Sequence, residues 1–431
     1  MLSPVTRWLL STLLSFYKAC ARRVLRVSRA LGFGATLSAE EERVVSGEAW
    51  DEFCDTLKAA GAAMLAPGAP RDPFNQAEGY RYLARLARAG LENYLECADV
   101  EAPQLCAIAN GSRAARVCIG SDNPDNLYEN ATIDGRREYV VRGTRGTVAY
   151  LGLGTQSGRY GAKGGLATVD YAEADALTYD DEARTRFTVV LAAERPPGWQ
   201  GNWLRLLPEP RDAMFIVRQT FGRRDDEVAA QLNISLRTGD FAARGGEAGG
   251  RPTPLTPARL DEGLQSAGVL VAGASMMFAR WAAGFQAHTN ELPLFDQERS
   301  NKAGGDPNIR YFHSYWKLPR GAALRIRVRP PACRCWNFQL NNHWMESLDY
   351  RYHTVHTNDS LATPDADDAG RYTIIVSHVD PNADASRGWR GNWIETVGHE
   401  CGTMCFRWVA PRVADALLPH PSVEVVRVEA L

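Results

Sequence analysis

The chain has 431 residues and a formal net charge of −2, and 45% of its residues are hydrophobic. This composition is typical of a folded globular protein and excludes global disorder. Because no basic field accompanies the near-neutral charge, we expect no nucleic-acid partner. The length favours roughly two to four domains. Nine cysteines, an odd number in a chain too large to need disulfide staples, favour reduced thiols.

The first 35 residues combine an apolar run, 8–17, with a basic stretch that follows it. The run is shorter than the roughly 20 residues of a spanning helix, and a secretory signal carries its charges before the run. Residues 1–35 therefore have two interpretations: an amphipathic basic helix at a membrane surface, or a helix docked on the protein's own core. We expect a cytoplasmic protein, with peripheral membrane association through this segment as the alternative to a fully soluble one.

Helical signals dominate residues 36–104. Ser38 and Glu41 fit a capping box, in which each residue satisfies a backbone N–H of the other. Asp72, followed directly by a proline, marks the start of a further helix. Apolar residues then recur at helical spacing, so this region is predicted to be a helical domain.

The pattern then changes twice. Residues 105–245 contain short β-type runs separated by Gly, Pro, Asn and Asp, which predicts a β-rich domain. A Gly/Pro-rich linker at 239–257 is followed by a long helix predicted over 255–292. β-type runs return over 300–415, the second predicted β domain, and residues 416–431 are predicted to be a tail.

An internal duplication is the strongest signal in the sequence. Residues 198–203, GWQGNW, are nearly repeated as GWRGNW at 388–393. Eleven residues after each copy a methionine opens a β-type run that carries an arginine: Met214 with Arg218, and Met404 with Arg407. Upstream, Asn126-Leu127-Tyr128 matches Asn308-Ile309-Arg310-Tyr311 with one insertion. Superposition of the two units is predicted to place Trp203 on Trp393 and Tyr150 on Trp336.

The same landmarks carry a family resemblance. The segments NPDNLY, RGTRGTVAYL, GWQGNW, WNFQLNNHWMESLDYR and GNWIETVGHECGTMCFRW resemble those of bacterial proteins with the "domain of unknown function 1214". This resemblance implies a β-sandwich, jelly-roll-like fold for the repeated units and brings no catalytic residues with it. The predicted fold class is therefore α+β: two homologous β-sandwich domains joined by a long helix, with N-terminal helices.

All eight histidines lie at or after His288. In the predicted superposition four of them replace other residue types: His313 replaces Asn130, His343 replaces Ser157, His378 replaces Ala193 and His399 replaces Glu209. Imidazole is the usual group for proton transfer near neutral pH. A histidine cluster on one of two duplicated domains therefore predicts a single active site. The alternative is that these histidines are dispersed rim or core residues.

Polar residues after the apolar stretch 336–340 complete the candidate catalytic set. Asn342 precedes His343, and Glu346 and Asp349 follow it, where a carboxylate could orient the imidazole or act as a base. The candidate catalytic residues are thus His343, His313, His378, His399, Glu346 and Asp349. We expect His343→Ala to abolish turnover with little change in melting temperature. The alternative is a loop capped by its own Asn and Asp side chains.

A metal site is an alternative interpretation of three of these histidines. His343, His378 and His399 are the candidate ligands for a divalent metal ion. No C-x-x-C pair occurs, and Cys401 and Cys405 fit better as buried apolar fillers. The sequence identifies no other cofactor.

Two functions are consistent with these patterns. The first is an enzyme that acts on a small, largely apolar molecule, such as a steroid, a terpenoid or an aromatic compound. His-based acid–base or metal-assisted chemistry in the second β domain would carry it. The alternative is a non-catalytic ligand-binding or assembly protein built from duplicated β-sandwiches. If the four histidines meet around one cavity the enzyme is favoured, and if they are scattered the alternative is favoured. The oligomeric state is left open.

Overall fold

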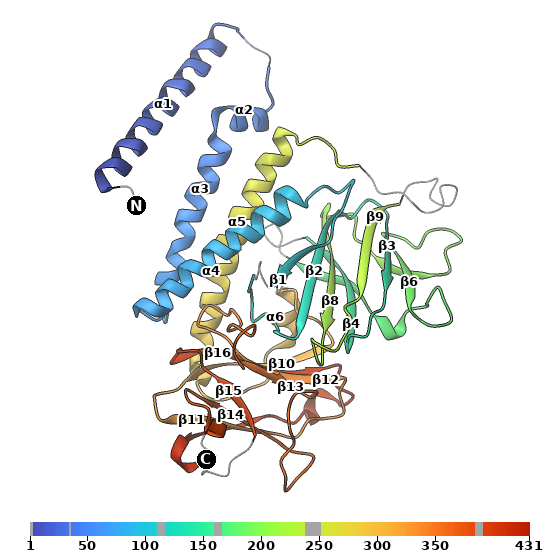
Figure 1. Cartoon of the computed structure of the whole chain (residues 1–431). Coiled ribbons are helices and arrows are strands. Elements are labelled where there is room, and N and C mark those ends of the chain that lie inside the picture. Colours follow the sequence, from blue (N-terminus) through green and yellow to red (C-terminus); the bar gives the residue numbers. More distant parts are fainter. Residues whose placement is uncertain (1–2, 34–35, 110–116, 159–165, 238–250, 384–390) are drawn as a thin grey trace.

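The structure, a computed structural model, describes residues 3–33, 36–109, 117–158, 166–237, 251–383 and 391–431. Helices cover one side of the molecule, and two β-rich halves lie beside them (Figure 1). The predicted α+β class is confirmed, with two sandwich-like halves, a long helix and N-terminal helices. Most of the predicted linker and the start of the second GWRGNW segment lie outside the described residues.

The helical layer is built on the predicted long helix, α5 (Pro257–Phe285). The helices that pack against it are α2 (Ala39–Ser46), α3 (Glu48–Ala60) and α4 (Pro73–Leu91). Shorter helical turns are η1 (Gly61–Leu65), η2 (Glu92–Glu96), η4 (Gln286–His288) and α6 (Gln297–Lys302). The capping box is confirmed, because Ser38 and Glu41 exchange side-chain-to-backbone hydrogen bonds at the start of α2.

The long helix is a core element. Together with η4 it forms the segment Pro257–His288, which is long and apolar enough for a membrane span by length and composition, and half of its most apolar window is buried inside the fold. Leu264, Leu270 and Phe278 of α5 share a hydrophobic cluster with Phe53 of α3 and Leu86 of α4. Its apolar stripe is therefore explained by packing, since a core helix meets the same criterion as a span.

None of the described residues of the N-terminal helix α1 (Pro4–Ala30) is buried, and none packs against the hydrophobic core of the helical layer, whereas Val44 of α2 does. Docking on the protein's own core, one of the two sequence-based interpretations, is therefore wrong. The helix stands beside α2 and α3 at the edge of the molecule (Figure 1).

The first β unit consists of two sheets, with strand orders β1-β2-β8-β4-β5 and β7-β6-β3-β9. Their inner faces share one hydrophobic core, to which Ile133, Phe215 and Val189 belong. The strands are β1 (Cys106–Ala109), β2 (Asn126–Asp134), β3 (Tyr139–Thr144), β4 (Tyr150–Ser157), β5 (Ala167–Glu173), β6 (Arg186–Ala192), β7 (Asn202–Arg205), β8 (Asp212–Thr220) and β9 (Gln231–Leu236).

The second β unit repeats this arrangement, with strand orders β10-β16-β12-β13 and β15-β14-β11-β17. Phe338, Ile374 and Phe406 belong to its core. The strands are β10 (Ile309–Lys317), β11 (Ala322–Val328), β12 (Cys335–Leu340), β13 (His356–Asn358), β14 (Tyr372–Ser377), β15 (Asn392–Glu395), β16 (Cys401–Val409) and β17 (Ser422–Arg427). Strand β17 lies in the segment predicted to be a tail. It pairs with β11 and so belongs to the second sandwich.

The duplication is visible strand by strand. Each strand from β2 to β9 has its counterpart eight strands later, in the same strand order, and the first unit has β1 beside β2 in addition. The predicted equivalence of Trp203 and Trp393 is confirmed, since Trp203 pairs with Val190 and Trp393 with Ile375 in matching parallel ladders. Each unit contains eight equivalent strands in two sheets, and one strand pair of each unit is parallel.

One predicted equivalence is displaced by a single residue. Arg218 pairs with Tyr128 and Arg407 with Tyr311, so these two pairs are equivalent. In the same frame the counterpart of Tyr150 is Cys335, not Trp336. The segment from Trp393 to Arg407 is one residue shorter than that from Trp203 to Arg218. Because strand side chains alternate, a shift of one residue reverses the face to which a residue points.

The two methionine landmarks show this reversal. Met404 belongs to the core of the second sandwich, whereas the neighbours of Met214, Ala213 and Phe215, belong to the core of the first. The tyrosine equivalence also removes the predicted insertion, because Tyr128 and Tyr311 each follow their proline, Pro124 or Pro307, by four residues. The predicted replacement of Asn130 by His313 agrees with this frame.

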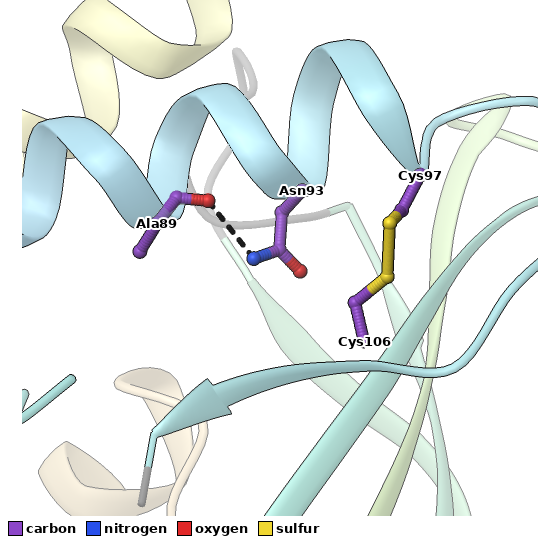
Figure 2. Close-up of a disulfide and its surroundings, with 4 residues drawn as sticks. All are labelled: Ala89, Asn93, Cys97 and Cys106. Carbon is purple, nitrogen blue, oxygen red and sulfur yellow. Dashed lines mark hydrogen bonds between the residues drawn. A yellow bond between two sulfur atoms is a disulfide. The ribbon is translucent and has the colours of Figure 1, made fainter. Parts of the chain in front are cut away.

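A disulfide joins the end of the helical layer to the first sandwich. Cys97, directly after η2, is bonded to Cys106 of β1 (Figure 2). The expectation that all thiols are reduced is therefore wrong for this pair. The odd number of cysteines concealed it, because seven other cysteines are free.

Candidate functional site

The two sandwiches face each other through equivalent sheets. Tyr150 of the first and Ile309, Cys335 and Val409 of the second form a small hydrophobic cluster between them. Tyr150 lies on β4, and the other three residues lie on β10, β12 and β16. These three strands are the counterparts of β2, β4 and β8 in the first unit. The interface is thus formed by the same surface of each unit.

Two buried arginines cross this interface reciprocally. Arg218 of the first sandwich donates through Nη2 to the carbonyl oxygen of Gly304, at 2.6 Å, in the loop before β10. Arg407 of the second donates through Nη2 to the carbonyl oxygen of Ser121, in the loop before β2. Ser121 and Gly304 each lie seven residues before the tyrosine that pairs with the arginine of their own unit. The crossing is therefore approximately two-fold symmetric.

A second reciprocal contact lies beside the arginines. The side chain of Asn123 accepts a hydrogen bond from Asn337 Nδ2 of the other sandwich, at 2.7 Å. Asp306, at the equivalent position, accepts from the hydroxyl groups of Tyr171, at 2.9 Å, and Tyr150, at 3.2 Å, of the other sandwich. The loops before β2 and β10 are thus each held by hydrogen bonds to the other sandwich.

A cavity of about 120 Å³ lies between these contacts. Phe278 and Trp281 of α5 close one side of it. Its other walls come from both sandwiches and their loops: Ile119, Gly120, Ser121, Asp122, Asn126, Tyr128, Ile216, Arg218, Ser300, Ala303, Gly304, Gly305, Asp306, Ile309, Tyr311, His313 and Arg407.

His313 breaks the symmetry of the cavity, because its counterpart in the first sandwich is Asn130. The side chain is 7% exposed, and its ring stacks between those of Phe285, 5.4 Å away, and Tyr311, 5.5 Å away. Burial, and then the charge of Arg407, lower the pKa of His313 to about 3. The imidazole is therefore neutral at pH 7.

The two ring nitrogens of His313 have different surroundings. Nε2 lies 3.9 Å from the sulfur of Cys405. Nδ1 is buried and has no hydrogen-bond partner among the described residues. A neutral imidazole with one unused nitrogen can accept or donate one hydrogen bond, depending on its tautomer.

The other predicted catalytic residues lie outside this cavity. His343 is buried near the helical layer, where its Nδ1 lies 3.0 Å from the hydroxyl oxygen of Tyr315, and burial lowers its pKa to about 4. His378 contacts the hydroxyl of Thr396, and His399 lies 3.8 Å from the carboxylate of Glu78. Of the four predicted histidines, only His313 lines the cavity.

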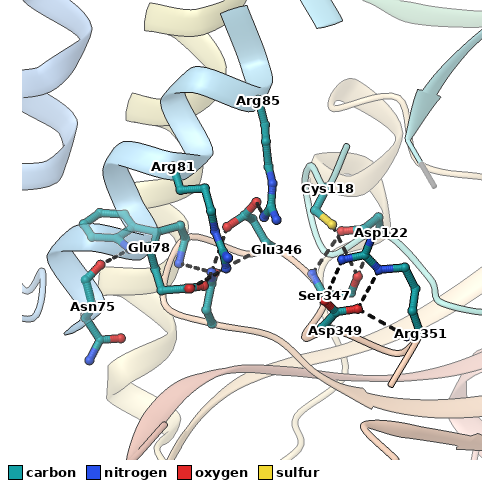
Figure 3. A network of polar contacts seen from close by, with 12 residues as sticks. Asn75, Glu78, Arg81, Arg85, Cys118, Asp122, Glu346, Ser347, Asp349 and Arg351 are labelled. Carbon is teal, nitrogen blue, oxygen red and sulfur yellow. Dashed lines mark hydrogen bonds and ion pairs between the residues drawn. The ribbon is translucent and has the colours of Figure 1, made fainter. Parts of the chain in front are cut away.

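The two predicted carboxylates have structural partners (Figure 3). Glu346 is 1% exposed and pairs with Arg85 of α4 at 2.6 Å. Burial raises the pKa of Glu346, and the charge of Arg85 opposes that effect. Asp349 pairs with Arg351, two residues away, at 2.7 Å. The segment that was predicted to be a catalytic strand end is thus a packed turn that fixes α4 to the second sandwich.

The candidate metal ligands are not assembled. Within the residues that the structure describes, no group of three or more His, Cys, Asp or Glu side chains could hold a metal ion. His343, His378 and His399 each contact a different partner, because they come from different strand ends and loops of the sandwich. These residues therefore do not fit a shared divalent metal.

Sequence reasoning missed the residues that shape the cavity. Arg218 and Arg407 were recognised only as landmarks of the repeat, and the equivalence of Tyr128 and Tyr311 was obscured by a supposed insertion. An arginine within an apolar strand was the available signal, since arginine is almost never fully buried without a partner.

Fold and site together define a class: a duplicated β-sandwich protein with a cavity between its two units. No known family profile matches the chain, and no curated protein matches it. Among solved structures, it is similar to an uncharacterised protein from Burkholderia cenocepacia, at 42% identity and a TM-score of 0.79, over 90% of this chain and 99% of that one. The chain therefore belongs to the same family as that protein.

A protein from Vibrio parahaemolyticus also matches, at 14% identity and a TM-score of 0.44, over 81% of this chain and 98% of that one. This likeness is too weak to bear on fold or function. The resemblance to proteins with the domain of unknown function 1214 stays a prediction. Since the Burkholderia relative is itself uncharacterised, family membership brings no activity with it.

A first expectation follows for His343. Its side chain is 1% exposed and contacts the Tyr315 hydroxyl, so His343→Ala removes packing and one buried hydrogen bond. We expect the free energy of unfolding to fall by about 2–4 kcal/mol. Urea unfolding measures it, with His288→Ala, an exposed histidine, as the control. This predicted loss of stability replaces the expectation, made from the sequence, that His343→Ala leaves the melting temperature nearly unchanged. A variant as stable as the wild type would contradict the burial of the His343 ring.

Proposed function

We propose that the protein binds a small, largely apolar molecule in the cavity between its two sandwiches. The observation that supports this function is His313 Nδ1, a buried ring nitrogen in the cavity wall without a partner among the described residues. Leaving a buried polar atom without a hydrogen bond costs about 1–3 kcal/mol. A ligand with one suitably placed polar group would remove that cost.

The size of the cavity narrows the ligand class. At about 120 Å³ it is comparable to apolar cavities of about 150 Å³ that hold benzene. Of the three classes that the sequence suggested, a single-ring aromatic compound fits this space, whereas steroids and terpenoids are larger. Phe278 and Trp281 offer ring faces and edges against which such a ligand can pack.

The charges around the cavity favour a neutral ligand. Two arginines, Arg218 and Arg407, and two aspartates, Asp122 and Asp306, line the space, so their formal charges cancel. Asp306 already accepts hydrogen bonds from two tyrosines, and Asp122 accepts two from Ser347. A neutral molecule therefore disturbs the balance least.

Binding is favoured over catalysis because the four candidate histidines do not meet. An enzyme remains the second candidate, supported by the same unpartnered nitrogen of His313. A pKa of about 3 makes this imidazole a weak base near neutral pH. In an enzyme, His313 would therefore hold and polarise a substrate group by hydrogen bonding rather than remove a proton.

Phenol is a suitable probe, because it combines one ring with one hydroxyl. Ala303 lines the cavity, and Ala303→Phe places a ring in the space that phenol would occupy. We expect saturation-transfer NMR to show phenol bound to the wild type and at least about tenfold more weakly to Ala303→Phe. The matched control is Ala414→Phe, at an exposed position. Circular dichroism verifies that both variants are folded, and undiminished phenol binding to Ala303→Phe would place the ligand elsewhere.

A further inference from the structure

Helix α1 presents an unusually large apolar surface to its surroundings. Trp8, Leu13 and Phe16 are 64%, 67% and 71% exposed. At 3.6 residues per turn, Leu9, Leu13 and Phe16 fall on one side of the helix, and Val24 and Val27 extend that side toward its C-terminal end. Exposed apolar patches of this kind mark interaction sites.

The opposite side of α1 is basic and faces the protein. Lys18 and Arg22 both pair with Asp51 of α3, the latter at 2.6 Å. Arg29 pairs with Glu42 of α2, also at 2.6 Å. Lys18, Arg22 and Arg29 share one helix face, so these ion pairs fix the rotation of α1 and point its apolar side away from α2 and α3.

The space between α1 and the helical layer is polar. A groove there is lined mainly by charged side chains, among them Arg22, Arg43, Glu48, Asp51 and Asp55. The protein therefore attracts α1 through charge and leaves its apolar side without a cover among the described residues.

We propose that α1 lies in the interface of an anionic lipid bilayer, with its apolar side among the acyl chains. The helix contains six basic residues and no acidic one: Arg7, Lys18, Arg22, Arg23, Arg26 and Arg29. Lys18, Arg22 and Arg29 pair with the protein, whereas Arg23 and Arg26 are exposed and have no ion pair among the described residues. The charge of these two arginines complements anionic lipid headgroups and would oppose a second α1. The apolar run 8–17 is too short to cross the bilayer, so the helix lies on it.

Two features favour contact between α1 and anionic headgroups. Arg23 is exposed, has no ion pair among the described residues and lies at the edge of the apolar side, from which its long side chain reaches the headgroups. The acidic residues of α3 lie behind α1, about one helix diameter of 10 Å from the lipid. At physiological salt that distance exceeds the Debye length of about 8 Å, so their repulsion is largely screened.

Sedimentation of the full chain with vesicles tests the proposal. We expect it to sediment with phosphatidylcholine vesicles that contain phosphatidylglycerol, and much less with phosphatidylcholine alone. Leu9→Ser with Leu13→Ser removes two residues from the apolar side and should weaken vesicle binding at least about tenfold. The matched control, Leu361→Ser with Leu417→Ser, changes two exposed leucines of the second sandwich and should bind as the wild type does.

Three results would overturn the proposal. They are no binding to either vesicle, equal binding to both, and unweakened binding of the Leu9→Ser, Leu13→Ser variant. Light scattering without lipid adds a further check. A dimer that becomes a monomer in that variant would assign the apolar side to a second copy of the chain instead. The variants are all at exposed positions, so folding does not confound the comparison.

Discussion

Acidification from pH 7 to about pH 4.5 is expected to lower the free energy of unfolding by about 5 kcal/mol through His313 and His343. Burial, with Arg407 as the second cause, lowers the pKa of His313 to about 3, and burial lowers that of His343 to about 4. Both start from an ordinary value of 6.5. Over about two pH units each imidazole binds a proton in the unfolded chain but not in the folded chain. This difference lowers the free energy of unfolding by about 2.7 kcal/mol per ring.

The direction follows from the sign of the shifts. Folding favours the neutral form of both imidazoles, so their contribution is fully present above pH 6.5. It is lost as the pH falls, until the folded protein also takes up the protons near pH 3 to 4. A loss of about 5 kcal/mol is comparable to the whole stability of many domains, which is about 5–15 kcal/mol.

Urea unfolding at the two pH values measures this dependence. His313→Gln and His343→Gln should each remove about half of the loss, because glutamine does not titrate. His288→Gln is the matched control, because it makes the same substitution at an exposed histidine. An identical pH dependence in all four proteins would show that the two rings are not buried as neutral groups.

Gly402→Ala is expected to destabilise the protein by about 3 kcal/mol or more. A Cβ atom at Gly402 of β16 would lie 2.1 Å from the carbonyl oxygen of Asn341 and 3.0 Å from Nε1 of Trp316. Asn341 cannot retreat easily, because its N–H donates to Thr403 and its side chain is fully buried. The same contact shows how closely β16 packs against the turn after β12.

Gly273→Ala is the matched control for this substitution. Gly273 lies in α5, and a Cβ atom there would meet nothing within 4 Å. Alanine at that position should stabilise the helix by about 0.5–1 kcal/mol. Thermal or urea unfolding of both variants gives the comparison, and equal stabilities would contradict the close approach of β16 to the turn.

The duplication was predictable because loop and strand landmarks survive in both copies. The two GW-G-NW segments locate Trp203 and Trp393 at the same ladder positions. The register of the other strands was not predictable from these segments. The chain from Trp393 to Arg407 is one residue shorter than that from Trp203 to Arg218, and such a difference reverses the face to which the following side chains point. Pairing between strands, not spacing along the chain, decides that Arg218 and Arg407 are equivalent.

The sequence predicted a site in the second β domain, whereas the cavity is lined by residues of both β units. Six candidate residues were chosen by residue type, and one of them, His313, lines the cavity. Most of the others are held by partners from distant segments, such as Arg85 for Glu346, which no local pattern reveals, whereas Asp349 pairs locally with Arg351. The disulfide between Cys97 and Cys106 was missed for a similar reason, because connectivity cannot be deduced from a count of cysteines.

The most direct measurement of a ligand site centred on His313 is the relative affinity for phenol and benzene. Both rings fit a space of this size, and only phenol can hydrogen-bond to Nδ1. One such bond contributes about 0.5–1.5 kcal/mol, so the wild type should prefer phenol by up to about tenfold. His313→Leu should bind the two with similar affinity. Equal affinities in the wild type, or a preference for phenol that survives in His313→Leu, would contradict a binding site at His313.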